Sequence, residues 1–309
     1  MGEPEPVRER ESERVCEQTP EPVGEWKPET VRVAVVGHVE WVQFGRVSHV
    51  PRAGEVEHAR EQFEEPAGGG AVAAVQLARL AGESLLLTAV GEDDLGDRSI
   101  ARLSELGVRV AAVRRRAGTR RAVTLVDDRR ERTIVTFGDR LEPVGADELP
   151  WGELEGMDAV YFTAGDLAAL RAARTARTLV ASPRARQALG HGVRLDALVL
   201  SEDDAIERRA AERAVDETDL LARTRGKHGG TFSTLTGAGS WEATKTPGDV
   251  ADAYGCGDSF AAGLTYALGT GREPRDALEL AARCGAMCLT GRGPYERQLT
   301  GREVAPMHL

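Results

Sequence analysis

The stretch DAYGCGDSF, Asp252 to Phe260, sets small residues in a row before an aspartate, and the apolar run AAGLTYALGTG (261–271) follows directly. Leucine and alanine recur in that run at helical spacing, which predicts a helix preceded by a glycine-rich turn. Backbone N–H groups at such a turn lack helical partners and carry the positive end of the helix dipole, so they attract phosphate. An aspartate would repel that anion unless its carboxylate does chemistry beside it.

The local pattern leaves two interpretations of Asp258. Its carboxylate can take the proton of a hydroxyl that attacks phosphorus, because phosphoryl transfer needs in-line positioning, charge stabilisation and a base or orienting group. Alternatively, Asp258 only caps the helix, since aspartate is favoured at helix N-termini.

The composition excludes several classes of protein. The 309 residues carry a formal net charge of −10, which argues against a general binder of nucleic acid or anionic membrane. No apolar run approaches the roughly 20 residues that span a bilayer, and the polar N-terminus shows no secretory signal. None of the four cysteines has zinc-site spacing, and Cys284 and Cys288 are interpreted as core residues. We therefore expect a cytoplasmic enzyme with no nucleic-acid and no membrane partner.

Strands alternate with helices along most of the chain, which predicts an α/β/α core with a mostly parallel central sheet. The expected strands are 31–37, 84–91, 157–164, 178–182 and 195–201, and the expected helices are 68–82, 94–107 and 166–176. Two segments break this alternation, because 42–63 and 119–138 resemble exposed or half-exposed strands. They predict a small projecting β-sheet, either decorative or a lid over a substrate site. The residues 1–29, rich in Glu, Pro and Arg, are expected to form a disordered tail.

The segment from Asp252 to Leu268 resembles the C-terminal signature D-T-x-G-A-G-D-x-F of the ribokinase-type (PfkB-like) carbohydrate kinase family. The match holds at Asp252, Gly255, Gly257, Asp258 and Phe260. The resemblance implies that Asp258 is the catalytic base. It also implies that the amides of Gly255, Cys256, Gly257 and Asp258 form the anion hole for the transferred phosphoryl group.

Other segments resemble the same family in the same order, so the resemblance covers residues 31–300 and leaves 301–309 as a C-terminal tail. The glycines of PAGGGAVA stand where the family has its Gly-Gly signature, which implies that Gly68, Gly69 and Gly70 contact the substrate. RTRGKHGGTF is similar to the family's T-x-G-x-x-G turn, which implies that Thr224, Gly226 and Gly229 lie by the nucleotide. Residues 89–108 and 281–294 resemble the family's G-x-D-x-x-G segment and the wall of its adenine pocket.

The resemblance implies a ribokinase-like three-layer fold with a lid, and an ATP-dependent transfer of phosphate to a hydroxyl of a sugar-like molecule with the help of Mg²⁺. It also implies a homodimer formed through the lids. In some family members the aspartate equivalent to Asp252 helps to bind a monovalent cation, which makes K⁺ a candidate cofactor here.

The sequence departs from the family at positions that would hold substrate and metal. The family's sugar-gripping acidic residue falls on Val42 and its sugar-contacting Asn on Val72, so two hydroxyl-binding groups are apolar here. Glu40 could grip the sugar instead, or be a surface glutamate on a strand edge. In the N-x-x-E motif, which organises magnesium and phosphate, Ser201 replaces Asn and Asp204 replaces Glu.

These departures keep two alternatives open beside the sugar kinase. An apolar site next to Trp41 would suit a nucleoside kinase of the same family, although packing is the other interpretation of this tryptophan. A non-catalytic binding or regulatory protein that kept the fold would also explain Val42 and Val72, but the intact Asp258 argues against it.

Overall fold

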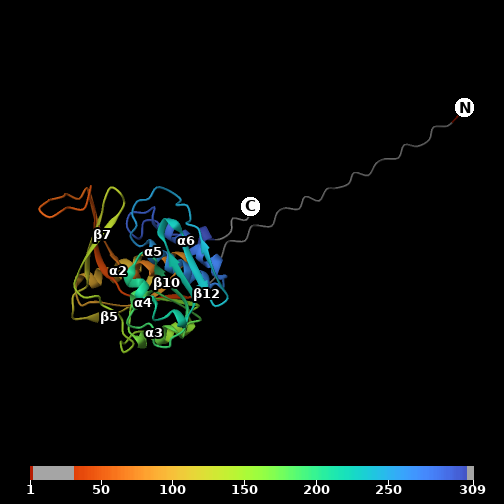
Figure 1. Cartoon of the computed structure of the whole chain (residues 1–309), viewed down its shortest axis with the longest axis horizontal. Coiled ribbons are helices and arrows are strands. Elements are labelled where there is room, and N and C mark those ends of the chain that lie inside the picture. Colours follow the sequence, from red (N-terminus) through yellow and green to blue (C-terminus); the bar gives the residue numbers. More distant parts are fainter. Residues whose placement is uncertain (3–30, 305–309) are drawn as a thin grey trace.

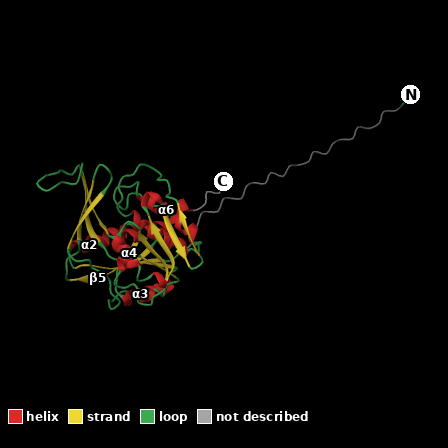
Figure 2. Cartoon of the chain, in the orientation of Figure 1, coloured by secondary structure: helices red, strands yellow, loops and turns green. Residues whose placement is uncertain are grey.

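The computed structural model describes residues 1, 2 and 31–304 of the chain. Within that part the chain forms a large β-sheet between helices and a smaller sheet beside it (Figures 1 and 2). The predicted three-layer α/β core with a separate small sheet is confirmed. Apart from residues 1 and 2, the tail expected at 1–29 lies outside the described residues, as does the chain after Val304.

The large sheet has nine strands, and the seven from β11 to β5 run parallel while β12 and β13 are antiparallel. In spatial order these are β13 (Gly237–Trp241), β12 (Gly230–Thr234), β11 (Thr218–Thr224), β10 (Leu195–Ser201), β9 (Thr178–Ala181), β8 (Ala159–Phe162), β1 (Val33–Val36), β4 (Ser84–Gly91) and β5 (Val108–Arg115). The central strands are buried on both faces, which explains why their sequences are continuous apolar runs rather than alternating ones.

Helices cover both faces of this sheet. They are α1 (Gly69–Ala81), α2 (Asp94–Glu105), α3 (Leu167–Ala173), α4 (Ala205–Ala211), α5 (Cys256–Gly269), α6 (Pro274–Cys288) and α7 (Gly301–Val304). Four short 3₁₀ segments join them, namely η1 (Trp151–Gly156), η2 (Pro183–Ala185), η3 (Val215–Glu217) and η4 (Gly226–His228). Strand side chains alternate between two cores: Val33 and Val35 pack with α1, α5 and α6, whereas Ala34 and Val36 pack with α3. Cys284 and Cys288 are fully buried on α6, as expected.

The small sheet has the order β3-β2-β6-β7, with β2 parallel to β6 and the other pairs antiparallel. Its strands are β2 (Glu40–Arg46), β3 (Glu61–Ala67), β6 (Arg121–Val126) and β7 (Arg132–Phe137). It projects from one side of the main body, where Figure 1 labels β7. The expected lid segment 42–63 is thus shifted, because β2 starts at Glu40, β3 ends at Ala67 and residues 47–60 contain no strand.

The prediction that β2 is exposed is wrong. Most of β2 is buried because its aromatic side chain Phe44 stacks on Phe63 with ring centroids 4.6 Å apart and meets Tyr254 edge-on at 4.9 Å. Trp41 also packs rather than standing open, since it is 7% exposed and the Arg98 guanidinium lies 4.2 Å from its ring centroid.

Two arginines of the small sheet bind the loop that leads into α5. Arg46 Nη2 donates to the carbonyl of Ala251 at 2.5 Å, and Arg132 Nη1 donates to the carbonyl of Ala253 at 2.8 Å. With the Phe44–Tyr254 contact, these bonds fix the small sheet against the segment that carries the glycine-rich motif.

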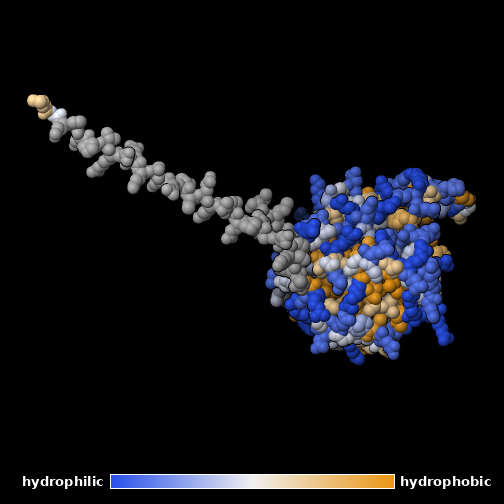
Figure 3. Space-filling view, turned by 180° about the vertical axis from the view of Figure 1, so that it is seen from behind, coloured by the Kyte–Doolittle hydropathy of each residue, from blue (hydrophilic) through white to orange (hydrophobic). Residues whose placement is uncertain are grey.

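The surface seen from behind is mostly hydrophilic with one apolar area (Figure 3). On the small sheet the edge strand β7 is exposed along its whole length and presents Ile134, Val135 and Phe137 to solvent. No helix among residues 31–304 is both long and apolar enough to cross a membrane.

Candidate active site

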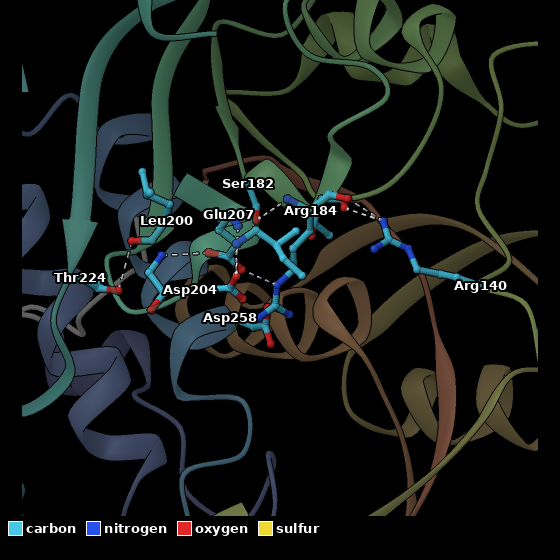
Figure 4. Close-up of polar contacts among 11 residues, drawn as sticks. Arg140, Ser182, Arg184, Leu200, Asp204, Glu207, Thr224 and Asp258 are labelled. Atoms are coloured by element: carbon cyan, nitrogen blue, oxygen red, sulfur yellow. Dashed lines mark hydrogen bonds and ion pairs between the residues drawn. The ribbon is translucent and has the colours of Figure 1, made fainter. Parts of the chain in front are cut away.

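The ends of the parallel strands place the polar residues of the candidate site. The carboxyl ends of parallel strands lie at one edge of a sheet, where ligands of open α/β sheets bind. At this edge His38 follows β1, Thr163 follows β8, Arg184 follows β9 and Glu207 follows β10. The N-terminus of α5 faces the same edge (Figure 4).

The glycine-rich motif forms the first turn of α5 itself, because the helix begins at Cys256 and not at Ala261, where the apolar run starts. Gly255 precedes it with φ 80, a left-handed conformation, and a Cβ there would lie 3.0 Å from Val72 Cγ1. The first helical bond runs from the Ser259 amide to the Gly255 carbonyl at 2.8 Å. The amides from Cys256 to Asp258 therefore precede the helical ladder, and a Cβ on Gly257 would meet open space. This geometry can receive an anion.

Asp258 is the third residue of α5, and its side chain does not cap the helix. The capping interpretation is therefore wrong. Its side chain is 14% exposed, and Arg184 Nη1 lies 3.7 Å from its Oδ1 (Figure 4). Burial raises the pKa of Asp258, while the charge of Arg184 lowers it. Because the effect of burial is the larger one, the Asp258 carboxylate can accept a proton although a positive charge lies beside it.

Arg184 is held by Glu207 of α4. Its Nε donates to Glu207 Oε1 at 2.9 Å, and the other carboxylate oxygen accepts the Ser201 amide at 2.9 Å. The opposite charges of Asp258 and Glu207 raise the pKa of Arg184, so this guanidinium stays charged.

The glycines Gly68, Gly69 and Gly70 lie between Asp258 and the end of β1. A Cβ on Gly69 would lie 3.0 Å from Asp258 Oδ1, and one on Gly68 would lie 3.0 Å from His38 Nε2. A Cβ on Gly70 would lie 2.7 Å from the His38 carbonyl oxygen. Only glycine permits this close approach. The structure thus brings together Gly69 and Asp258, which the sequence predicts separately as site residues.

Glu40 is 7% exposed, so the interpretation as a surface glutamate is wrong. Burial raises its pKa, and Arg120, whose Nε lies 3.5 Å from Glu40 Oε2, lowers it. Its Cγ would lie 3.3 Å from a Cβ on Gly68, which places the carboxyl next to the glycine turn. The apolar substitutes Val42 and Val72 are fully buried and belong to the core.

His38 and Thr163 leave polar atoms unpaired in this region. Burial lowers the pKa of His38 well below its usual value, and the charges of Arg140, Arg184 and Arg120 lower it further, so the imidazole is neutral at pH 7. Within residues 31–304 neither His38 Nδ1 nor Thr163 Oγ1 has a hydrogen-bond partner, although both atoms are buried. Such atoms are costly to leave unpaired, which points to a polar ligand or water.

The predicted nucleotide residues lie on the β11–β12 turn. Thr224 ends β11 and its hydroxyl donates to the Leu200 carbonyl at 3.2 Å. Gly226 and Gly229 both have positive φ, and a Cβ on Gly229 would lie 2.1 Å from the Trp241 carbonyl oxygen.

The two residues predicted to bind metal, Asp204 and Ser201, make other contacts in this structure. Asp204 Oδ1 accepts the amides of Ile206 at 2.8 Å and Glu207 at 3.1 Å, so this carboxylate caps α4. Glu207, which the sequence analysis did not select, reaches Arg184 instead. In the part of the chain that the structure describes, no three acidic, histidine or cysteine side chains cluster as a metal site.

Asp252 joins two loops of the site. Its Oδ1 accepts the Tyr254 amide at 2.8 Å and its Oδ2 accepts the Gly293 amide at 2.7 Å. Burial raises its pKa, and the two amides lower it. The carboxylate therefore fixes the approach to α5 against the loop expected to wall the adenine pocket.

Comparison with known sequences gives one family. The profile described as pfkB family carbohydrate kinase matches residues 31–300. The chain is 31% identical over 273 residues to the ATP-dependent ribose-1-phosphate kinase of Halopiger xanaduensis, and the alignment covers 83% of this chain and 91% of that protein.

Comparison with solved structures gives the same fold. The ribokinase of Thermotoga maritima superposes with a TM-score of 0.69 at 21% identity, covering 89% of this chain and 98% of that one. The nucleoside kinase of Burkholderia thailandensis superposes with a TM-score of 0.70 at 17% identity, covering 88% and 95%.

Proposed function

The chain belongs to the pfkB family of carbohydrate kinases, and from this premise we propose that it transfers the γ-phosphoryl group of ATP to a hydroxyl of a small sugar-like acceptor with Asp258 as the base. One observation carries the assignment: the Asp258 carboxylate stands in the first turn of α5 beside the unpaired amides and against Gly69. A non-catalytic protein has no need of a base whose burial raises its pKa in that place.

The reaction follows from this placement. Asp258 takes the proton of the acceptor hydroxyl as its oxygen attacks the γ-phosphorus, and the bond from that phosphorus to the bridging oxygen of ADP breaks. The amides from Cys256 to Asp258 lie where negative charge develops, and they are fixed before the reaction starts.

Arg184 supports the same step. Its Nη1 lies 3.7 Å from the Asp258 carboxylate while Nε donates to Glu207, so the guanidinium is oriented without help from the substrate. A positive charge at this point can stabilise the transferred phosphoryl group, as a positioned arginine does in other phosphoryl transferases.

The ATP site is assigned to Thr224, Gly226 and Gly229, since the turn after β11 lies at the carboxyl edge of the sheet and its positive-φ glycines allow close backbone approach. The residues fit Mg²⁺, because this ion prefers oxygen ligands, keeps several waters and needs only one or two carboxylates in addition to phosphates. Asp204, whose Oδ1 caps α4, and Ser201 would hold it, whereas both carboxylate oxygens of Glu207 already accept bonds, from Arg184 and from the Ser201 amide. When bound, the ion neutralises charge on the phosphates.

The K⁺ dependence stays a prediction. Asp252 is the candidate residue, and its carboxylate oxygens already accept two amides, so a cation would reinforce a loop that these bonds support. Assays in K⁺, Na⁺ and tetramethylammonium salts at equal ionic strength test it: a rate that is the same in all three contradicts the proposal.

The assembly proposed from the exposed strand is a homodimer. An edge strand with Ile134, Val135 and Phe137 in solvent is a template for pairing with a second copy. Light scattering should show a dimer for the wild type and a monomer for Val135→Glu. We also propose a cytoplasmic location and a small-molecule partner, and the net charge of −10 argues against binding of nucleic acid or anionic membrane.

The test of the function is ADP release from Mg·ATP with a panel of pentoses, hexoses, sugar phosphates, sugar acids and nucleosides. We expect at least one acceptor to stimulate release by the wild type and Asp258→Asn to lose most of that rate while still binding ATP. If only nucleosides stimulate release, the acceptor class is wrong and the nucleoside kinase alternative holds. If nothing stimulates release and ATP does not bind, the kinase proposal fails.

A further inference from the structure

Three arginines from distant parts of the chain converge beside the proposed base. Arg120 precedes β6 in the small sheet, Arg140 follows β7, and Arg184 follows β9. Arg140 Nη2 donates to the carbonyls of Arg184 at 3.2 Å and Thr163 at 3.1 Å, which fixes these two arginines together (Figure 4). Arg120 joins them through Glu40, at 3.5 Å from its carboxylate.

Each of the three guanidiniums faces a carboxylate, but Arg140 is also buried near two like charges. Burial lowers the pKa of Arg140, and the charges of Arg184 and Arg120 lower it further, although Glu142 opposes them. All three arginines also lower the pKa of the same imidazole, that of His38. The positive charges of Arg120 and Arg184 thus act on Arg140, and an anion bound among the three guanidiniums would favour their charged forms.

The arginines also retain donors for such an anion. The Nε atoms of Arg140, Arg184 and Arg120 each face a carboxylate, of Glu142 at 2.6 Å, Glu207 at 2.9 Å and Glu40 at 3.5 Å, and of these three contacts only the one from Arg184 is a hydrogen bond. A guanidinium has five N–H donors. Within residues 31–304 the hydrogen bonds made by Nη atoms are one from Arg120 to Thr136 and two from Arg140 Nη2 to carbonyls. The buried His38 Nδ1 and Thr163 Oγ1, which have no partner in the described chain, lie in the same region.

We propose that Arg120, Arg140 and Arg184 form a subsite for a phosphate group that the acceptor already carries, so that the enzyme phosphorylates a sugar phosphate rather than a free sugar or a nucleoside. The inference rests on the proposed function and names its acceptor class. Arg184 borders both phosphoryl groups, because it also faces Asp258. Three guanidiniums match a dianion, whereas one bidentate arginine suffices for a carboxylate. Glu40, next to Arg120 and the glycine turn, is placed to accept a sugar hydroxyl.

The buried valines fit this acceptor. Val42 and Val72 remove hydroxyl-binding groups of the family pattern, and the core encloses both completely. A phosphate held by several charge-assisted hydrogen bonds replaces that lost recognition, since bonds to charged groups are about twice as strong as neutral ones.

The experiment compares ribose, inosine, ribose 1-phosphate, ribose 5-phosphate and gluconate as acceptors for the wild type, Arg120→Gln, Arg140→Gln and the control Arg60→Gln. Arg60 is a lid-side arginine of similar type, with a side chain 60% exposed and paired with Asp128. We expect a sugar phosphate to be preferred by kcat/KM. In Arg120→Gln and Arg140→Gln the ratio of kcat/KM for the phosphorylated over the free pentose should fall about 30- to 100-fold, and Arg60→Gln should not change it.

Binding measured by calorimetry without ATP gives a second readout. The two site variants should weaken binding of the sugar phosphates and leave binding of Mg·ADP unchanged. The proposal is overturned if the wild type prefers free ribose, inosine or gluconate, and in that case the kinase function still stands. It is also overturned if the variants weaken nucleotide binding instead, because the arginines would then serve ATP. Arg120→Lys and Arg140→Lys, which keep the charge, should recover part of the affinity if the subsite is correct.

Discussion

Arg184 Nη1 lies 3.7 Å from Asp258 Oδ1, too far for a hydrogen bond and close enough for its charge to be felt. Glu207 on the other side of Arg184 holds the guanidinium at Nε. This spacing leaves the carboxylate oxygen free to accept a proton from a substrate. A direct bond would occupy the oxygen that the proposed reaction needs.

Asp258→Asn should reduce kcat by about 100- to 10,000-fold, because general-base catalysis contributes that much. ADP release measures the loss. The folded protein should not lose stability: burial raises the folded pKa of Asp258, so its ionised form at neutral pH is less favourable in the folded than in the unfolded chain. A lower melting temperature together with lost ATP binding would show that the variant acts through structure.

The activity should fall as acid protonates Asp258, at a pH above the ordinary aspartate pKa of about 3.9, because burial raises its pKa. Arg184 lowers that pKa, so Arg184→Gln should move the acid limb of kcat/KM to higher pH and reduce the rate by about 100-fold. A pH profile of both proteins measures the shift. An acid limb that stays in place would show that another group controls it.

Gly69→Ala should reduce kcat by about 10- to 100-fold, because its Cβ would lie 3.0 Å from Asp258 Oδ1 and 3.3 Å from Thr163 Oγ1. The matched control is Gly152→Ala in η1, where a Cβ meets nothing within 4 Å. Equal rates in the two variants would contradict the contact between the glycine turn and the base.

Gly257→Ala should fold normally, because a Cβ there meets nothing within 4 Å. The added methyl enters the open space at the first turn of α5, where the anion is expected. We therefore expect an unchanged melting temperature with weaker catalysis, measured as kcat. Full activity would show that the anion does not bind at this turn.

Asp252→Asn should destabilise the protein by about 1–3 kcal/mol, because an amide side chain cannot accept both the Tyr254 and the Gly293 hydrogen bond with its single oxygen. Urea unfolding measures the change. Asp204→Asn serves as a comparison, since Asp204 Oδ1 accepts two amides with one oxygen and an asparagine can keep both bonds. Equal losses in the two variants would contradict the loop-joining role of Asp252.

The sequence predicts the fold well where its signals are local. Continuous apolar runs such as 33–36 mark strands buried on both faces, and the motif around Asp258 marks the start of α5. The pairing of Gly69 with Asp258 was also accessible, because both belong to motifs of one family.

The sequence does not predict contacts that depend on tertiary packing. β2 alternates enough to look exposed, yet Phe63 and Tyr254 bury it from distant parts of the chain. Arg120, Arg140 and Arg184 are single members of an arginine-rich chain, and only the strand order brings them together. Glu207 was missed because Asp204 matched the motif, whereas the Asp204 carboxylate is used to cap α4.

The bonds from Arg46 and Arg132 to the carbonyls of Ala251 and Ala253 connect the small sheet to the loop before Gly255. A small sheet that lifts to admit substrate must break both bonds, and the loop that positions the first turn of α5 then loses its support. The proposed lid would therefore do more than exclude water. It would also couple closure to catalysis, because the first turn of α5 would be in position only when the small sheet is closed. ATP bound to an open molecule would then not be hydrolysed.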